Sequence, residues 1–577
     1  MEYDLGRLGD AGTNFLGIDV HGLDVPAFLA TARHLYPLLG LLWLGALLRI
    51  RRAGWLLAGI VAANAFAWLE TNYPLQRIYA FGPSRDRVGN VALCQVVAAG
   101  NPPLQTWQVG QMHFEPFWGL LVAAVSGWNV ERVLRLYPWF SLIMMAALAV
   151  SISLGLRPGP GERGGRRWEA VFAAGLATLL CSMPFDSTRP YRVPWAMTFL
   201  LKPNHALGLV MLPIVLRAFA GIRTWRGRLV TGLLLHVMGW VFVLHMFYVV
   251  VGLAAFTALS MLRWPGEARR DALDSAVVIG VNLLVVSPYL VMLVAGYPAF
   301  TRSPLMTLDP ASAHLMEVTF RHGFVFWLGL WGLVVLLRRG DRLSRLWAAQ
   351  VVGGLALWLA YYVLSALQLA RERDEIYYWN AFLLAAVAGI GCWDLGGRAA
   401  AWLARPPVAP AIRAAALGAL LLPFTLPYWW NPASMDGYFT LSLPPLAAPL
   451  RQATDFIRGQ TAPQDVIAGD PDFARYVAAL AGRRALVGLT LPLPRDWDER
   501  WRLQGMLVAV PDPQAAVAAA ARYGVRYLVV TPYLLSTYYS GTDLGRIGAQ
   551  RHLQSVFFTG DPDGDYVAIY RVKKRES

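Results

Sequence analysis

Long apolar stretches, separated by shorter polar ones, run through the first 430 residues of the chain. They are about 15 to 24 residues long, close to the ~20 residues that cross roughly 30 Å of hydrocarbon as a helix. The pattern predicts twelve membrane-spanning helices, at 34–50, 54–69, 134–156, 170–185, 198–216, 229–243, 245–262, 275–296, 323–337, 346–367, 378–396 and 412–430. The apolar run at 229–262 is interpreted as two short spans because this keeps the arginine-rich connections on one side.

The polar connections fall into two sets that differ in charge. One set holds 21 arginines in 60 residues, at 49–53, 157–167, 217–228, 263–270, 338–345 and 398–413. The other set is longer and carries 13 basic residues, at 1–33, 70–133, 186–202, 297–322 and 371–377. The positive-inside rule places the first set in the cytoplasm and the second set, with both termini, outside.

The pattern changes after Trp430, where alternating helix-like and strand-like segments begin. Amphipathic segments at 449–460, 472–482 and 512–524 alternate with short β-branched segments at 465–469, 483–488 and 526–531. The end of the chain predicts a hairpin whose turn is Asp561-Pro562-Asp563-Gly564. We therefore predict a transmembrane domain, 1–430, with a large outer loop at 70–133, followed by a soluble extracytoplasmic α/β domain, 431–577.

Composition agrees with a polytopic membrane protein. Hydrophobic residues make up 56% of the chain and charged residues only 15%, whereas a soluble domain usually has about 25% charged residues. This excludes a cytoplasmic enzyme and a disordered scaffold. The net charge of +15 does not indicate nucleic-acid binding, because most arginines lie in the short connections, where topology explains them.

No cofactor follows from the sequence. The three cysteines are far apart and predict neither a disulfide framework nor a metal site. No Walker loop or dinucleotide fingerprint appears in the structural context that it requires. A cytoplasmic nucleotide-sugar donor is therefore not supported. No ligand motif supports a divalent cation. His236 and His245 lie within apolar spans without an acidic partner at helical spacing, so we interpret them as core or cavity residues.

The outer loop 70–133 contains the main candidate chemistry. Asp86 stands at the start of a predicted helix, 87–99, which is followed by the break Gly100-Asn101-Pro102-Pro103 and later by Glu115-Pro116. This order resembles the first outer loop of lipid-phosphate-sugar-dependent membrane glycosyltransferases with the GT-C fold, such as the protein mannosyltransferases and the lipid A aminoarabinose transferases. The resemblance implies a GT-C-like fold and a catalytic-base role for Asp86. The chain departs from that family in having two predicted helices before the loop and an arginine at position 87.

Chemistry gives an independent reason to examine this loop. Glycosyl transfer needs a carboxylate that removes the proton of the acceptor hydroxyl as the new bond forms. Asp86 is the first candidate for this base, and Glu115 is the second candidate or an acid that binds the acceptor. Asp86 could instead cap its helix or pair with a neighbouring arginine. His113 and His205 are candidates for acceptor or substrate binding.

Two other outer segments carry cations suited to a departing phosphate, where negative charge develops. The first surrounds the predicted helix 198–216 and supplies Arg189, Arg192 and Lys202. A lysine in the membrane region is costly unless it is paired, lines a polar cavity or extends to the interface. The second segment resembles the arginine- and tyrosine-bearing motif that many GT-C transferases place near the donor phosphate. That resemblance points to Arg371, Arg373 and Tyr377.

These features predict an inverting hexosyl- or pentosyltransferase in a bacterial-type inner membrane. It would embed in the lipid bilayer, use a polyprenyl-phosphate-linked sugar from the periplasmic side, and act on a glycan, lipid or protein acceptor. Two other functions remain open, a polytopic transporter and a non-catalytic membrane assembly protein. A transporter does not call for so large an outer domain, and it usually carries more intramembrane acids.

Overall fold

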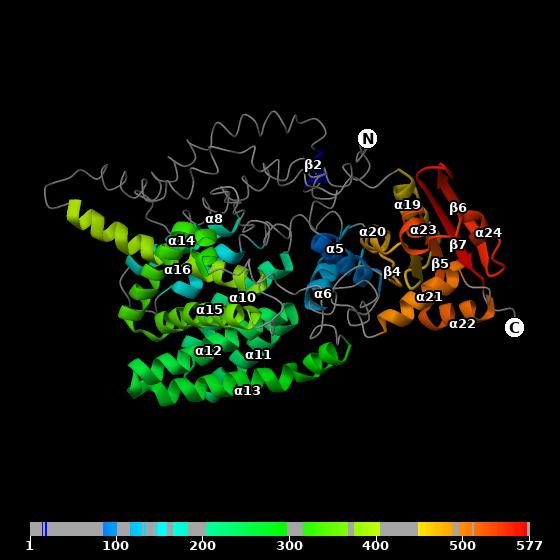
Figure 1. The fold of residues 1–577 in the computed structure, drawn as a ribbon. Helices are drawn as coiled ribbons and strands as arrows, with labels where there is room; N and C mark the ends of the chain where they lie inside the picture. The colour runs from blue at the N-terminus through cyan, green and yellow to red at the C-terminus, as the bar shows by residue number, and fades with distance from the viewer. Residues whose placement is uncertain are drawn as a thin grey trace.

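The structure is a computed structural model of the chain, and it is mostly helical with a small C-terminal sheet (Figure 1). The residues that it describes are 14–15, 18–19, 85–100, 116–129, 132–133, 144, 147–157, 165–182, 203–296, 315–366, 374–403, 448–487, 496–509 and 513–573. The predicted spans 34–50, 54–69 and 412–430 lie outside the described residues. Near the N-terminus, β1 (Asn14–Phe15) pairs antiparallel with β2 (Ile18–Asp19).

Eight helices pack side by side into a bundle, coloured cyan to yellow-green in Figure 1. They are α8 (Gly165–Ser182), α10 (Pro203–Ala220), α11 (Trp225–Val241), α12 (Val243–Arg263), α13 (Pro265–Gly296), α14 (Leu315–Arg339), α15 (Arg342–Ala366) and α16 (Asp374–Leu403). Small residues let some backbones approach closely. Gly332 of α14 lies against Val387 of α16, and Gly389 of α16 lies against Ala173 of α8. Large buried side chains such as Trp347 fill the core between the helices.

Among the described residues, four helices are long and apolar enough to cross a membrane: α12, α13, α15 and α16. Two shorter apolar helices overlap predicted spans: Ala147–Leu156 lies within 134–156, and Ala206–Ala220 extends four residues past 198–216. The membrane character of the chain is thus supported, while the count of twelve spans stays a prediction.

The division of the apolar run at 229–262 is confirmed. Phe242 has extended backbone angles (φ −159°, ψ 106°) and separates α11 from α12. Its N–H still donates to the carbonyl of Met238, so the break is a single residue wide. The two helices therefore reverse direction there, as the distribution of arginines predicts.

Three predicted connections are partly helical. The segment 263–270 was predicted to be an arginine-rich connection, but α13 already begins at Pro265. Similarly, α16 begins at Asp374, inside the predicted outer connection 371–377, and continues to Leu403, inside the predicted connection 398–413. In α13 the extra helix is stabilised because its acidic residues pair with arginines of neighbouring helices, as described below.

The described part of the outer loop includes α5 (Arg85–Ala98), where the pattern predicts a helix, and α6 (Pro116–Val125). These helices pack on each other, and α5 packs on α20 (Pro471–Ala481) of the C-terminal region (Figure 1). A buried apolar cluster joins the three helices and includes Val91, Trp118 and Ala478. The loop and the C-terminal region therefore share one core and lie on the same side of the bundle.

The C-terminal region is an α/β sandwich, with the predicted hairpin at its end. Its helices are α19 (Ala448–Gln460), α20 (Pro471–Ala481), α21 (Trp497–Ala509), α22 (Pro513–Tyr523), α23 (Pro532–Tyr538) and α24 (Leu544–Gly548). Its strands are β3 (Val466–Gly469), β4 (Arg484–Ala485), β5 (Val525–Val530), β6 (Leu553–Gly560) and β7 (Tyr566–Val572), in the order β4-β3-β5-β7-β6. The first three strands of that order are parallel, and β7 and β6 are antiparallel to their neighbours.

Alternate residues of the central strands enter opposite layers, as the two-residue period of a strand requires. Leu528 of β5 packs in the layer that contains α21 and α22. Its neighbours Tyr527 and Val529 pack in the layer that contains α19 and α20. Both faces of the sheet are thus covered, which explains why strand β5 is apolar at nearly every position.

Candidate active site

The backbone of the structure places three of the predicted site residues on helices. Asp86 is the second residue of α5, His205 lies in the first turn of α10, and Tyr377 lies in the first turn of α16. The other predicted site residues lie outside the described residues: His113, Glu115, Arg189, Arg192, Lys202, Arg371 and Arg373. All the site assignments therefore stay predictions, and the described helices show which of their segments come together.

The N-terminal ends of α10, α12 and α16 meet around one buried aromatic group, the His245 cluster, which consists of Phe242, His245, Tyr248 and Trp379. The ring of His245 is 4.6 Å from the ring of Phe242 and 5.2 Å from the indole of Trp379, measured between centroids. Tyr248 packs on the same indole at 5.5 Å. Trp379 belongs to α16 and the other three residues to α11–α12, so the cluster joins these helices.

His245 also joins α12 to α10. Its Nδ1 lies so close to Gly208 that a Cβ added to this glycine would overlap it. His245 is 1% exposed and Trp379 is fully buried. The imidazole thus lies between the backbone of α10 and a side chain of α16, which are the two helices preceded by the predicted phosphate-binding segments.

The two helices begin at the same level relative to this cluster. α10 begins five residues before Gly208, and α16 begins five residues before Trp379. At 1.5 Å per residue, both starts are about 7.5 Å along the helix from the cluster. Helix N-termini carry partial positive charge and attract anions such as phosphate. Lys202 and Arg373 each directly precede one of these helices in the sequence.

The outer-loop helices border this group. Leu207, next to Gly208 on α10, packs against the core shared by α5, α6 and α20. Phe117 of α6 packs in return against the core of the bundle. The helix that begins with Asp86 and the helix that directly follows Glu115 therefore lie beside the outer half of α10.

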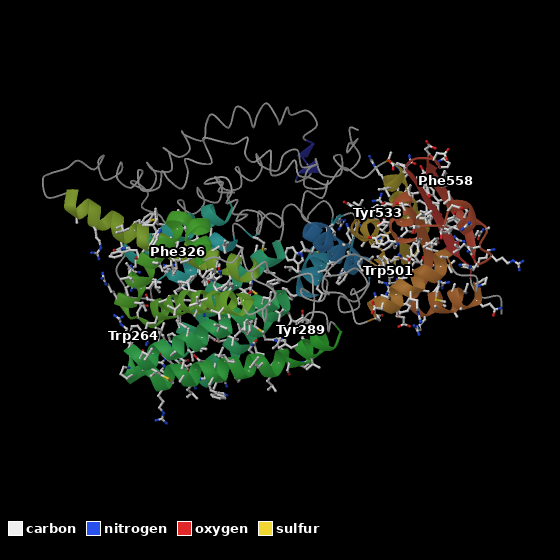
Figure 2. All side chains as sticks on the ribbon, in the orientation of Figure 1. Trp264, Tyr289, Phe326, Trp501, Tyr533 and Phe558 are labelled. Atoms are coloured by element: carbon white, nitrogen blue, oxygen red, sulfur yellow. The ribbon has the colours of Figure 1, made fainter. Side chains whose placement is uncertain are left out.

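The His245 cluster lies near the Tyr289 end of α13, because Trp240, two residues before Phe242, stacks on Tyr289 at 5.5 Å between ring centroids. Trp264 and Tyr289 mark opposite ends of α13, and the C-terminal region, marked by Trp501, Tyr533 and Phe558, lies beyond the Tyr289 end (Figure 2). We call the Trp264 end of the bundle the arginine end, because it contains the connections 217–228, 263–270 and 338–345. The candidate site and the arginine end are thus on opposite sides of the bundle.

The charged side chains at the arginine end are engaged with one another. Asp271 and Asp274 of α13 are fully buried, and Arg228, Arg342 and Arg345 converge on them. The ion pairs include Arg228 to Asp274 at 2.6 Å, Arg342 to Asp271 at 3.2 Å and Arg345 to Asp271 at 3.1 Å. Such mutual pairing is typical of a structural network, because buried charges need partners.

A second group at the arginine end ties α8 to the connection between α14 and α15. Arg166 donates to Asp341 at 2.8 Å, and Ser344 donates to the same carboxylate through its backbone N–H and its hydroxyl. Burial opposes ionisation of Asp341, but the hydrogen bonds from Ser344 and Arg166 outweigh it, so the pKa of Asp341 is lower than usual. These groups line a small cavity with Glu169 and Arg339. Sequence analysis missed both groups, although acids three residues apart in an arginine-rich segment were a visible signal.

A metal centre was not found within the described parts of the chain. No three His, Cys, Asp or Glu side chains there are grouped so that they could hold an ion.

No family model and no curated protein matches the chain. Several solved structures are similar to it, among them oligosaccharyltransferases. One is the archaeal oligosaccharyltransferase AglB from Archaeoglobus fulgidus in complex with an inhibitory peptide and a dolichol-phosphate, with 13% identity, a TM-score of 0.48, and coverage of 89% of this chain and 74% of that chain. Another is the Archaeoglobus fulgidus oligosaccharyltransferase in complex with Zn and sulfate, with 13% identity, a TM-score of 0.49, and coverage of 88% and 72%. Likeness of this degree does not transfer an activity, so the function is argued from the chain's own residues.

Proposed function

We propose that the chain is an integral membrane glycosyltransferase that uses a polyprenyl-phosphate-linked sugar and acts on the outer side of the membrane. One observation carries the proposal: α10 and α16 meet at His245, and each directly follows a segment of predicted phosphate-binding cations. The outer-loop helices pack beside α10. The helix that carries the predicted base, Asp86, is thus a third segment next to α10 and α16. A carboxylate base and phosphate-binding cations are the two groups that this reaction requires.

In the proposed reaction, Asp86 takes the proton of the acceptor hydroxyl as its oxygen bonds to the anomeric carbon of the sugar. The bond between that carbon and the phosphate oxygen breaks, and the electron pair leaves with the polyprenyl phosphate. Lys202, Arg371 and Arg373 stabilise the charge that gathers on the phosphate, since arginine can bind it through two parallel hydrogen bonds. Attack opposite the leaving group inverts the anomeric centre.

The outer orientation is supported by the arrangement of the bundle. α5 and α6 lie beside the end of the bundle opposite the arginine end (Figures 1 and 2), and the His245 cluster is near that end because Trp240 stacks on Tyr289. Arginine-rich connections face the cytoplasm in inner-membrane proteins. The site would therefore open to the periplasm, where polyprenyl-linked monosaccharides serve as donors without nucleotides.

The test is a transfer assay on purified protein with a polyprenyl-phosphate sugar and a panel of glycan, lipid and peptide acceptors. Asp86→Asn should lose about 10²–10⁴-fold in turnover, the usual range for general-base catalysis, while donor binding is retained. Asp543→Asn is the matched control, because Asp543 is likewise an aspartate at the start of a helix, where its side chain accepts from the N–H of Arg546. This control should keep wild-type turnover.

Donor binding is tested with Lys202→Ala and Arg373→Lys. Both should raise the donor KM and leave the acceptor KM unchanged, with Arg398→Lys at the arginine end as the control. Full turnover in Asp86→Asn would remove this residue from the mechanism and direct the test to Glu115. Substrate uptake into proteoliposomes without any transfer would overturn the proposed function in favour of a transporter.

A further inference from the structure

We propose that His245 is a positioning residue for the donor phosphate, because its ring sets the spacing between the N-terminal ends of α10 and α16, at the second turn of each helix. The inference rests on the proposed function, in which the residues preceding these helices bind the phosphate. Unlike those residues, His245 does not touch the donor. It acts through the two helices that it separates.

The contacts of His245 are those of a spacer. Its imidazole meets the backbone of α10 at Gly208, where the missing side chain leaves room for the ring. On α16 it meets the indole of Trp379 at 5.2 Å. Tyr248 also packs on this indole, so two side chains of α12 hold Trp379. The separation of α10 from α16 at this level is thus set by the imidazole of His245 and the indole of Trp379, which pack between the two helices.

The position of His245 is itself fixed by its neighbours. His245 is in the first turn of α12, directly after the break at Phe242, and its N–H donates to the Phe242 carbonyl at 3.1 Å. Phe242 packs edge-on against the imidazole at 4.6 Å. Closely packed interiors transmit changes of even one methylene group, so a smaller side chain at position 245 would move the adjoining helix turns.

Phosphate binding is sensitive to such movement. Two cation-bearing segments share one small anion, and bidentate hydrogen bonds require defined geometry. A displacement of about 1 Å at a reacting group can cost 10²-fold in rate. We therefore expect His245→Ala to weaken phosphate binding about tenfold or more, in protein that remains folded and monodisperse.

The probe is farnesyl phosphate, with farnesol as its uncharged counterpart, and binding of both is measured by equilibrium dialysis on the full chain in detergent. His245→Ala and Gly208→Ala should each weaken farnesyl phosphate binding and leave farnesol binding unchanged. Because the added Cβ of Gly208→Ala overlaps the imidazole, the two effects should not multiply. The double variant should bind within about twofold of His245→Ala alone.

Gly155→Ala is the matched control. Gly155 packs closely against Pro213, farther along α10, where an added Cβ would also overlap. It should lower the melting temperature without changing the ratio of the two affinities. If His245 had only a structural role, its variants would also lose stability without a change in the ratio of the farnesyl phosphate affinity to the farnesol affinity. An unchanged ratio in His245→Ala and Gly208→Ala would therefore overturn the inference. If the wild-type protein does not prefer farnesyl phosphate to farnesol, the proposed function itself fails.

Discussion

Asp274 holds three helices together at the arginine end, and its replacement by Asn should destabilise the protein. Its carboxylate is fully buried and accepts from Arg228 of α11 at 2.6 Å and from Arg342 of α15. Breaking a buried ion pair by removing one partner costs about 3–5 kcal/mol, because the other charge stays buried. Arg342 would retain Asp271 and the carbonyl of Ile222, 3.3 Å away. We therefore expect the lower end of that range, about 3 kcal/mol.

The free energy of unfolding is measured by SDS titration of the detergent-solubilised protein, followed by circular dichroism. Asp455→Asn serves as the control, because Asp455 pairs with Arg458 at 3.2 Å and both side chains are well exposed. Exposed pairs contribute about 0–1 kcal/mol. An Asp274→Asn protein within about 1 kcal/mol of wild type would refute the argument that this network stabilises the bundle. So would a control that is equally destabilised.

Two further predictions concern the topology and the C-terminal region. Alkaline phosphatase fused after Trp430 should be active and green fluorescent protein fused there should be dark, because the arginine distribution places this region outside; the reverse pattern would invert the orientation. Burial lowers the pKa of His552, although its ring lies 3.4 Å from the Leu507 carbonyl. The unfolded chain thus binds the proton more readily, so stability is full above about pH 6.5 and falls as the pH drops below it. Thermal unfolding of the full chain at pH 7.5 and 5.5 should show this loss in wild type and a smaller one in His552→Gln; equal losses would contradict it.

Much of the fold follows from local pattern. The strand around Leu528, the helix before it and the closing hairpin were predicted because β-branched runs, alanine-rich amphipathic runs and Asp-Pro-Asp-Gly turns each restrict the backbone locally. The break at Phe242 followed from a different rule, the placement of arginines on one side. Helices α21, α23 and α24 were missed, because α23 and α24 are short and the segment of α21 has only weak helical periodicity.

The contacts between distant helices could not be predicted in this way. The segment 263–270 was interpreted as a connection because it is charged, and nothing local shows that Asp271 and Asp274 meet arginines from α11 and α15. His245 was interpreted as a core or cavity residue, which its burial confirms. Its contact with Gly208 depends on the packing of α10 against α12, and a glycine within an apolar run does not reveal what fills the space beside it.

The core shared by α5, α6 and α20 affects the order in which the protein can be completed. Val91 and Trp118 belong to the early part of the chain, whereas Ala478 and Leu480, which pack with them, follow every described helix of the bundle. During synthesis the loop helices would emerge early, with apolar surface uncovered until the C-terminal region is exported. A nascent chain stopped before α20 would contain the predicted base and the whole bundle but not the surface that holds α5. The final stage of translation thereby becomes the step at which α5 gains the surface of α20 that packs against it.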